Sequence, residues 1–159
     1  MRITLTGASG FIGRRLIERL ESGGHALRVV GRKRVGSLPF FFWEARAENL
    51  PPEESLREAD AVIHLAGEPL GQRWTPEAKR RIRASRVEGT RRLVEALERF
   101  PLRPSVLVCA SAIGIYGSRG DEVLTEQSPP GAGFLAEVCQ GWEEAAGAAE
   151  ALGVRVVRL

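Results

Sequence analysis

The sequence predicts an α/β fold in which a doubly wound, mainly parallel sheet of about six strands carries helices on both faces. Segments with helical periodicity separate short apolar segments, an alternation that is typical of parallel sheets. A glycine-rich turn over 7–13 joins the first apolar segment to the first helical one. Right-handed crossovers between such units favour the strand order 3-2-1-4-5-6. The six apolar segments are 2–6, 27–30, 40–43, 61–65, 106–110 and 154–159.

Capping residues and apolar spacing predict where the helices begin and end. The first helix begins at Phe11, and the glycines at 23–24 are typical of a helix C-terminus. Thr75 is an N-cap before a proline at the first helical position, and the helix that it opens is expected to reach Phe100. A further helix is expected over 134–152.

The composition is that of one globular domain and argues against nucleic-acid and membrane partners. The chain has 159 residues, 43% of them hydrophobic and 27% charged, with a formal net charge of +3. Its 23 basic residues, all arginine except Lys33 and Lys79, are interspersed with glutamate, which is typical of solvated helix faces. No apolar run approaches ~18 residues and no signal peptide precedes the first strand, so a cytoplasmic location is expected. Cys109 and Cys139 lack metal-binding spacing, which predicts buried free thiols and no metal site.

The turn over 7–13 has the spacing and the context of a dinucleotide-binding turn. Gly7 permits a tight turn, Gly10 a close approach of the backbone to a pyrophosphate, and Gly13 close packing of helix against strand. The phosphates would lie on backbone N–H groups at the helix N-terminus. A plain strand–turn–helix is the alternative. The predicted cofactor-binding residues of this turn are Gly7, Ser9, Gly10, Phe11, Ile12 and Gly13.

The end of the second strand indicates which nicotinamide cofactor the turn would serve. NAD-binding versions place a carboxylate there to hold the ribose hydroxyls, whereas this chain has Arg32, Lys33 and Arg34. Guanidinium groups pair with a 2′-phosphate, which a carboxylate would repel. NADP(H) is therefore favoured over NAD(H), the alternative being a solvated basic turn.

Several motifs resemble one protein family. The stretch 6–13 resembles the cofactor loop of extended short-chain dehydrogenases/reductases. The stretches 60–69, 85–90, 111–117 and 134–143 are similar to an atypical subgroup, the nucleoside-diphosphate-sugar epimerase-like proteins that are also labelled cell-division-inhibitor-like. The resemblance implies an NAD(P)-binding Rossmann domain over 1–159, with the C-terminal substrate domain of the family absent from this chain. It also adds Leu65, Ala66 and Gly67 to the expected cofactor site.

The chain departs from the family in its catalytic residues. The family uses a Ser/Thr, a tyrosine and a lysine four residues later, but no such Tyr-Lys pair occurs in 134–140. By resemblance, Ser111 stands at the Ser/Thr position, or Ala112 does in a shifted alignment. Tyr116, the only tyrosine, is a pocket aromatic in relatives rather than the base.

Two further polar residues lie near the carboxyl end of the fourth expected strand, His64 within it and Glu68 after it. Glu68 lies where ligands bind in open α/β sheets and is a candidate replacement for the missing base, with a loop glutamate as the alternative. The candidate catalytic residues are thus Ser111, Tyr116 and Glu68. His64 is expected to be a packed core histidine rather than an acid or base.

These features predict an NADP(H)-binding protein of the sugar-nucleotide epimerase/dehydratase type, an oxidoreductase or epimerase with an atypical active site. The alternative is a non-catalytic NADP(H)-binding redox sensor or docking protein. The expected partner is a small-molecule substrate, in the first place a nucleoside-diphosphate sugar. No nucleic-acid or membrane partner is expected, and homo-oligomer formation is an open alternative.

Overall fold

The computed structural model describes all 159 residues as alternating strands and helices around one sheet. The strands are β1 (Arg2–Thr6), β2 (Ala26–Gly31), β3 (Phe40–Phe42), β4 (Ala61–His64), β5 (Val106–Cys109) and β6 (Arg155–Arg158). The α-helices are α1 (Phe11–Ser22), α2 (Glu53–Leu56), α3 (Pro76–Arg83), α4 (Gly89–Glu98) and α5 (Phe134–Gly147). A π-helical turn η1 (Ala84–Glu88) joins α3 to α4, and two 3₁₀ helices are η2 (Ile113–Tyr116) and η3 (Ala148–Leu152).

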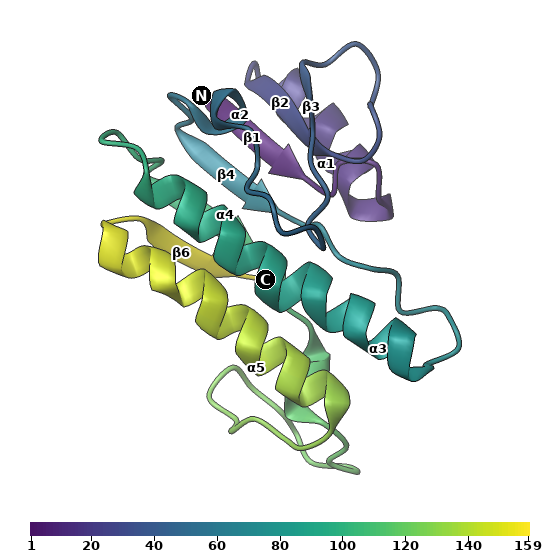
Figure 1. The fold of residues 1–159 in the computed structure, drawn as a ribbon. Helices are drawn as coiled ribbons and strands as arrows, with labels where there is room; N and C mark the ends of the chain where they lie inside the picture. Colours follow the sequence, from purple (N-terminus) through teal and green to yellow (C-terminus); the bar gives the residue numbers. More distant parts are fainter.

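The sheet has the predicted order and is parallel throughout. Its order is β3-β2-β1-β4-β5-β6, and every neighbouring pair is parallel. Thr6, at the end of β1, pairs with Val30 on one side and with His64 on the other. The chain therefore builds outwards from β1 in one direction and then in the other (Figure 1). This reversal opens a crevice at the carboxyl ends of β1 and β4, the usual ligand site of such sheets.

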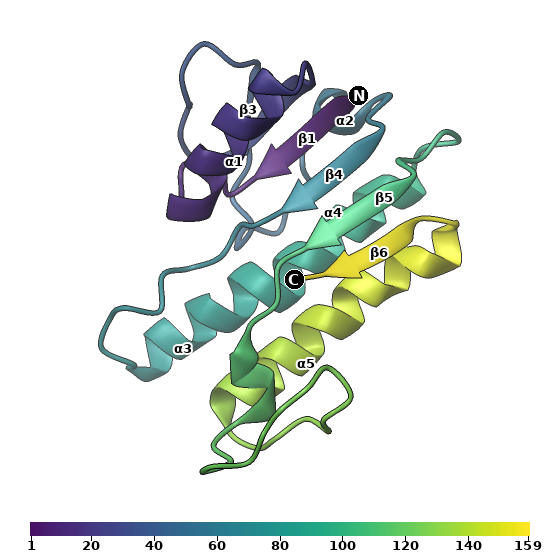
Figure 2. The same cartoon turned by 180° about the vertical axis from the view of Figure 1, so that it is seen from behind.

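Helices cover the two faces unequally. The helices α4 and α5 lie over one face (Figure 1) and enclose a core that includes Trp43, Leu97 and Trp142. On the other face α1 contributes Ile17 to a smaller core with Leu5 and Val29. Figure 2 shows that no helix lies over β4, β5 and β6 on this second face. No helix of the structure has the length and apolar character needed to cross a membrane.

The helix predicted from Thr75 to Phe100 differs from the observed one in its middle. Thr75 is the N-cap, and its Oγ1 accepts a hydrogen bond of 3.2 Å from the Ala78 N–H. The helix then widens into the π-helical turn at 84–88 before continuing as α4 to Glu98. The apolar spacing did not reveal this turn, because one widened turn alters a helical pattern by a single residue. The short helices α2 and η2 were also not predicted.

Candidate cofactor site

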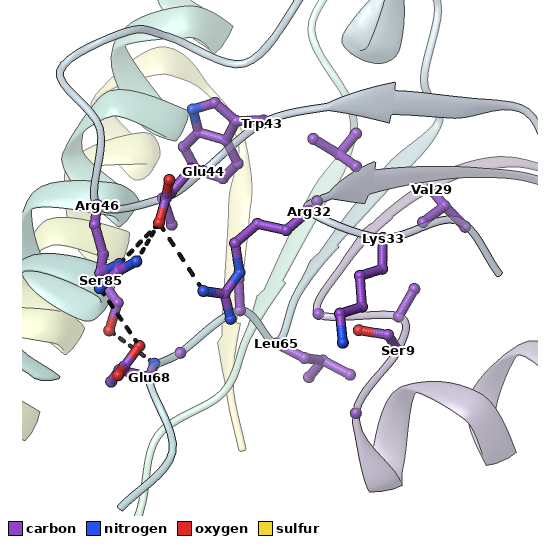
Figure 3. A pocket seen from close by; sticks show the side chains of 18 of the residues that line it. Ser9, Val29, Arg32, Lys33, Trp43, Glu44, Arg46, Leu65, Glu68 and Ser85 are labelled. Carbon is purple, nitrogen blue, oxygen red and sulfur yellow. Dashed lines mark hydrogen bonds and ion pairs between the residues drawn. The ribbon is translucent and has the colours of Figure 1, made fainter. Parts of the chain in front are cut away.

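A cavity of about 260 Å³ lies at the carboxyl ends of β1, β2 and β4, on the crevice where the strand order reverses. Five separate stretches of chain form its wall, as Figure 3 shows. They are the glycine turn, the basic turn, the segment after β3, the loop after β4, and one residue of η1. The lining residues are 7–10, 29–33, 43–46, 65–69 and Ser85.

The glycine turn leaves no room for side chains on the side that faces the sheet. Gly7 has φ +71°, and a Cβ built there would lie 2.5 Å from the backbone carbonyl of Leu65. A Cβ at Gly13 would lie 2.5 Å from the Gly7 oxygen, so this glycine permits α1 to pack against the end of β1. Gly10 is the N-cap of α1 and makes no side-chain cap. The first-turn N–H groups of α1 are thus left for a ligand or for water.

The predicted cofactor-binding residues divide between the cavity wall and its surroundings. Phe11 and Ile12 are 91% and 65% exposed as whole residues, and neither lines the cavity. Gly13 lies behind the turn, and Arg34 is directed to the face of Phe40, with its Cζ 5.1 Å from the ring centroid. The other predicted cofactor-binding residues all line the cavity. They are Gly7, Ser9, Gly10, Arg32, Lys33, Leu65, Ala66 and Gly67.

A carboxylate that the sequence reasoning missed lies beside the basic turn. No carboxylate stands at the end of β2 itself, as the sequence shows. In the structure the Trp43 N–H donates to the Gly31 carbonyl oxygen at 3.0 Å, which places the residue after Trp43 next to Arg32. Glu44 Oε1 lies 3.9 Å from Arg32 Nη1. Pairing between β2 and β3 brings the two together, although they are 12 residues apart in the chain.

Side chains of the π-helical turn η1 form hydrogen bonds with the backbone of Glu68 in the loop after β4. The Glu68 N–H donates to Ser85 Oγ at 2.9 Å, and Arg86 Nη1 donates to the Glu68 carbonyl oxygen at 3.0 Å. Arg86 also stacks over Trp142 of α5, with its Cζ 5.2 Å from the ring centroid. Both Ser85 and Arg86 belong to η1, so the widened turn explains how one helix reaches both backbone groups.

The Glu68 carboxylate is held by cations. It accepts a hydrogen bond of 3.2 Å from Arg81 Nε, lies 3.9 Å from Arg46 Nη1, and its side chain is 13% exposed. Partial burial acts to raise the pKa of Glu68, but the hydrogen bonds from Arg81 and Gln72 and the charge of Arg46 outweigh it, so this pKa lies below its usual value. A carboxylate of lowered pKa is a weak proton acceptor at neutral pH. These cation contacts fit the alternative interpretation of Glu68 as a loop glutamate, while its candidate role as a base stays a prediction.

Ser111 and Tyr116 lie after β5 and do not line the cofactor cavity. Ser111 Oγ donates a short hydrogen bond to Oε1 of Glu143 in α5, and its backbone N–H donates to the Leu159 oxygen at 2.6 Å. Tyr116 ends η2 and is half-buried. The structure thus brings Glu68 to the cofactor residues, and it pairs Ser111 with a carboxylate that the sequence reasoning had not singled out.

The two cysteines are buried free thiols, as predicted, and each has a raised pKa. Burial raises the pKa of Cys109 to about 12. Burial also raises the pKa of Cys139, although the positive charge of Arg86 acts against it. Neither thiol is therefore suited to act as a nucleophile at neutral pH.

His64 is the packed core residue that the sequence predicted. It is fully buried, with Nδ1 2.6 Å from Thr6 Oγ1 and Nε2 3.0 Å from Thr90 Oγ1. Thr6 Oγ1 also accepts a hydrogen bond of 3.2 Å from the Ala66 N–H. The His64–Thr6 pair therefore supports the loop that lines the cavity.

Comparison with known proteins decides the family. The NAD dependent epimerase/dehydratase family matches residues 3–157. The chain belongs to this family. A plant family member, the chloroplastic SDR39U1 homolog of Arabidopsis thaliana, is 41% identical in an alignment of length 154 that covers 90% of this chain and 43% of the relative. YfhF of Bacillus subtilis is 32% identical in an alignment of length 162 that covers 99% of this chain and 53% of that protein. The chain spans about half the length of the curated relatives it matches.

Solved structures of the family agree in fold. A nucleoside-diphosphate sugar epimerase from Corynebacterium glutamicum has a TM-score of 0.84 and 38% identity, covering 100% of this chain and 33% of that one. Human SDR39U1, solved with NADPH, has a TM-score of 0.80 and 30% identity, covering 99% and 52% of the two chains. MoeE5, solved with UDP-glucose and NAD, has a TM-score of 0.81 and 27% identity, covering 99% and 52%. The resemblance to extended short-chain dehydrogenases/reductases is therefore confirmed.

Proposed function

We propose that the protein binds NADP(H), in preference to NAD(H), in the cavity at the ends of β1, β2 and β4. The observation that carries this proposal is the convergence of the glycine turn, the Arg32–Lys33 cations and the Ala66–Gly67 backbone on one cavity. The turn fits a pyrophosphate, because Gly7 and Gly13 leave its backbone accessible at the N-terminus of α1. Figure 3 shows Lys33 directed towards Ser9, so a cation lies beside this turn. The NADPH of the human relative supports the choice of cofactor.

The whole protein would then act as an oxidoreductase or epimerase on a nucleoside-diphosphate sugar. Family membership favours this function over a non-catalytic sensor or docking role, and MoeE5 was solved with UDP-glucose. A nicotinamide cofactor supplies hydride transfer in such reactions. Residues 1–159 would supply the cofactor-binding domain, and a substrate domain would complete the site.

Ser111 and Glu143 would supply the proton-transfer path in place of the missing Tyr-Lys pair. The Ser111 hydroxyl already donates to the Glu143 carboxylate, so its oxygen is free to accept a hydrogen bond from a substrate hydroxyl. Passage of the substrate proton to Ser111 Oγ, with the Ser111 proton moving to Glu143, would leave the charge on the substrate oxygen. Tyr116 would line the substrate side, and Glu68 would order the cations around it.

Titration of the purified protein with NADPH and with NADH, followed by nucleotide fluorescence, tests the cofactor assignment. Tighter binding of NADPH is expected, and binding of neither nucleotide would contradict the proposal. Turnover of UDP-sugars by the full-length protein tests the catalytic part. Cofactor binding without turnover of any sugar nucleotide would instead support the sensor or docking role.

A further inference from the structure

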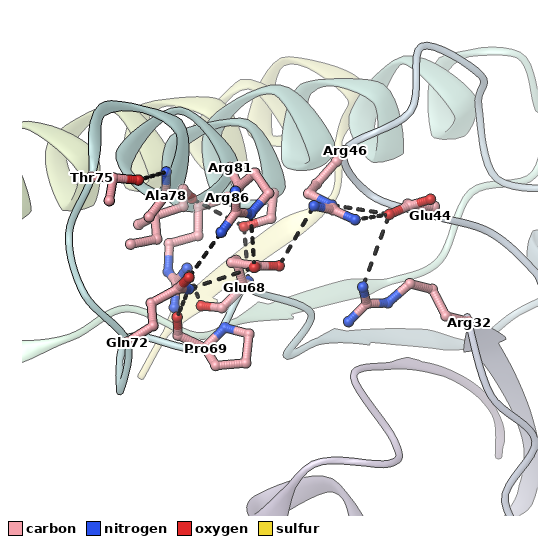
Figure 4. Close-up of polar contacts among 12 residues, drawn as sticks. Arg32, Glu44, Arg46, Glu68, Pro69, Gln72, Thr75, Ala78, Arg81 and Arg86 are labelled. Atoms are coloured by element: carbon pink, nitrogen blue, oxygen red, sulfur yellow. Dashed lines mark hydrogen bonds and ion pairs between the residues drawn. The ribbon is translucent and has the colours of Figure 1, made fainter.

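Glu44 lies between two guanidinium groups in the wall of the cofactor cavity. Its Oε1 accepts hydrogen bonds from Arg46, from Nε at 2.9 Å and from Nη2, and faces Arg32 Nη1 at 3.9 Å. Arg46 faces the Glu68 carboxylate as well, at 3.9 Å. Figure 4 shows the resulting row of alternating charges, and all four residues line the cavity.

A carboxylate between two guanidinium groups marks a position that suits an anion. Carboxylates and phosphates share the geometry that arginine recognises through paired N–H donors. The contact with Arg32 exceeds hydrogen-bond distance, and the Arg32 side chain is 53% exposed, so solvent screens this pair strongly. Arg46 is only 30% exposed and is held by two carboxylates. The anion position is therefore built chiefly by Arg46, while Arg32 is free to turn towards a ligand.

We propose that Glu44 occupies, in the free protein, the position of the 2′-phosphate of NADP(H), and that Arg46 joins Arg32 in reading that phosphate. This inference rests on the proposed function and extends it to a residue that no sequence motif indicated. The phosphate oxygens replace the carboxylate as acceptors of the two guanidinium groups. When NAD(H) binds, Glu44 stays in place and its carboxylate accepts a hydrogen bond from the ribose 2′-hydroxyl. Arg46 and Glu44 therefore act on cofactor choice in opposite directions.

Dissociation constants for NADPH and NADH, measured by calorimetry on matched variants, test this assignment. Arg46→Met is expected to weaken NADPH binding at least ~10-fold and to change NADH binding less than ~3-fold, because only NADPH carries the phosphate that Arg46 would contact. Arg46→Lys should restore part of the loss. Arg81→Met is the matched control. Arg81 is 39% exposed, it also pairs with Glu68, and it lies outside this cavity. Its substitution should leave the NADPH-to-NADH ratio unchanged.

Glu44→Gln tests the other half of the inference. Loss of the competing negative charge should tighten NADPH binding several-fold and weaken NADH binding, so the ratio of the two constants should rise about 10-fold. Thermal unfolding of each variant establishes that it is folded. The inference would be overturned if the NADPH-to-NADH ratio of dissociation constants were equal in Arg46→Met and Arg81→Met, or unchanged in Glu44→Gln. NADPH binding by the parent protein would still leave the proposed function intact. Binding of neither nucleotide by the parent would overturn both.

Discussion

Mild acid is expected to weaken the fold through His64. This side chain is fully buried between Thr6 and Thr90, and burial lowers its pKa from 6.5 to about 4. Below about pH 6.5 the unfolded chain takes up a proton that the folded protein does not accept. The stabilisation is thus fully present above that pH and is lost progressively as the pH falls towards 4.

The size of the effect follows from the two pKa values. Their difference corresponds to roughly 3 kcal/mol of unfolding free energy over the whole window, and to about 2 kcal/mol by about pH 5. Glu68 and other carboxylates of lowered pKa contribute mainly below this window, because in the unfolded chain they take up protons only near their usual pKa, about 4.3. The loss between about pH 6.5 and about pH 5 is therefore assigned to His64.

Urea unfolding at a series of pH values measures this loss. His64→Gln provides the comparison, because its amide can still form hydrogen bonds but does not titrate. The variant should be less stable than the parent at about pH 7.5 and should lose much less stability on acidification. Equal pH dependence of the unfolding free energy in the parent and the variant would refute the reasoning.

Three further outcomes are expected. Arg32→Asp should weaken NADPH binding at least ~10-fold and change NADH binding little, because a charged contact is worth roughly 1.5–3 kcal/mol. Calorimetry that shows equal losses for both nucleotides would mean that Arg32 is only a surface charge. Gly7→Ala should lower the melting temperature and abolish NADPH binding, because the added Cβ would lie 2.5 Å from the Leu65 carbonyl. Gly24→Ala is the control, since Gly24 also has a positive φ (+74°) but has open space around it. A similar loss of NADPH binding in Gly24→Ala would refute this account. Residues 1–159 alone should bind NADPH but turn over no sugar nucleotide. They should also self-associate through the sheet face that no helix covers, which light scattering would detect. Robust turnover of a sugar nucleotide would place a complete active site within these residues.

The sequence predicted the features that depend on neighbouring residues. The strand order followed from the alternation of segments, and Gly7 and Gly13 lie where a side chain would collide with backbone. Glu44 was missed because its proximity to Arg32 depends on how β2 pairs with β3, which no local pattern records. The role of Ser85 was missed for a related reason, since only the π-helical turn brings its hydroxyl to the Glu68 backbone.

The arginine-rich composition has different functions at different positions around the cavity, and burial separates them. Arg86 is half-buried, stacks on Trp142 and donates to a loop carbonyl, so its charge is used to hold the loop after β4 in place. The Arg32 side chain is 53% exposed, and its nearest carboxylate, that of Glu44, lies 3.9 Å away. Arg32 can therefore bind a ligand without breaking a strong contact. A guanidinium with few partners is the one that a phosphate can recruit at little cost, because only the solvent-screened contact with Glu44 competes for Arg32 in the free protein. The net charge of +3 therefore says little about partners, whereas the difference between these two arginines makes Arg32 the one that a 2′-phosphate would recruit under the proposed function.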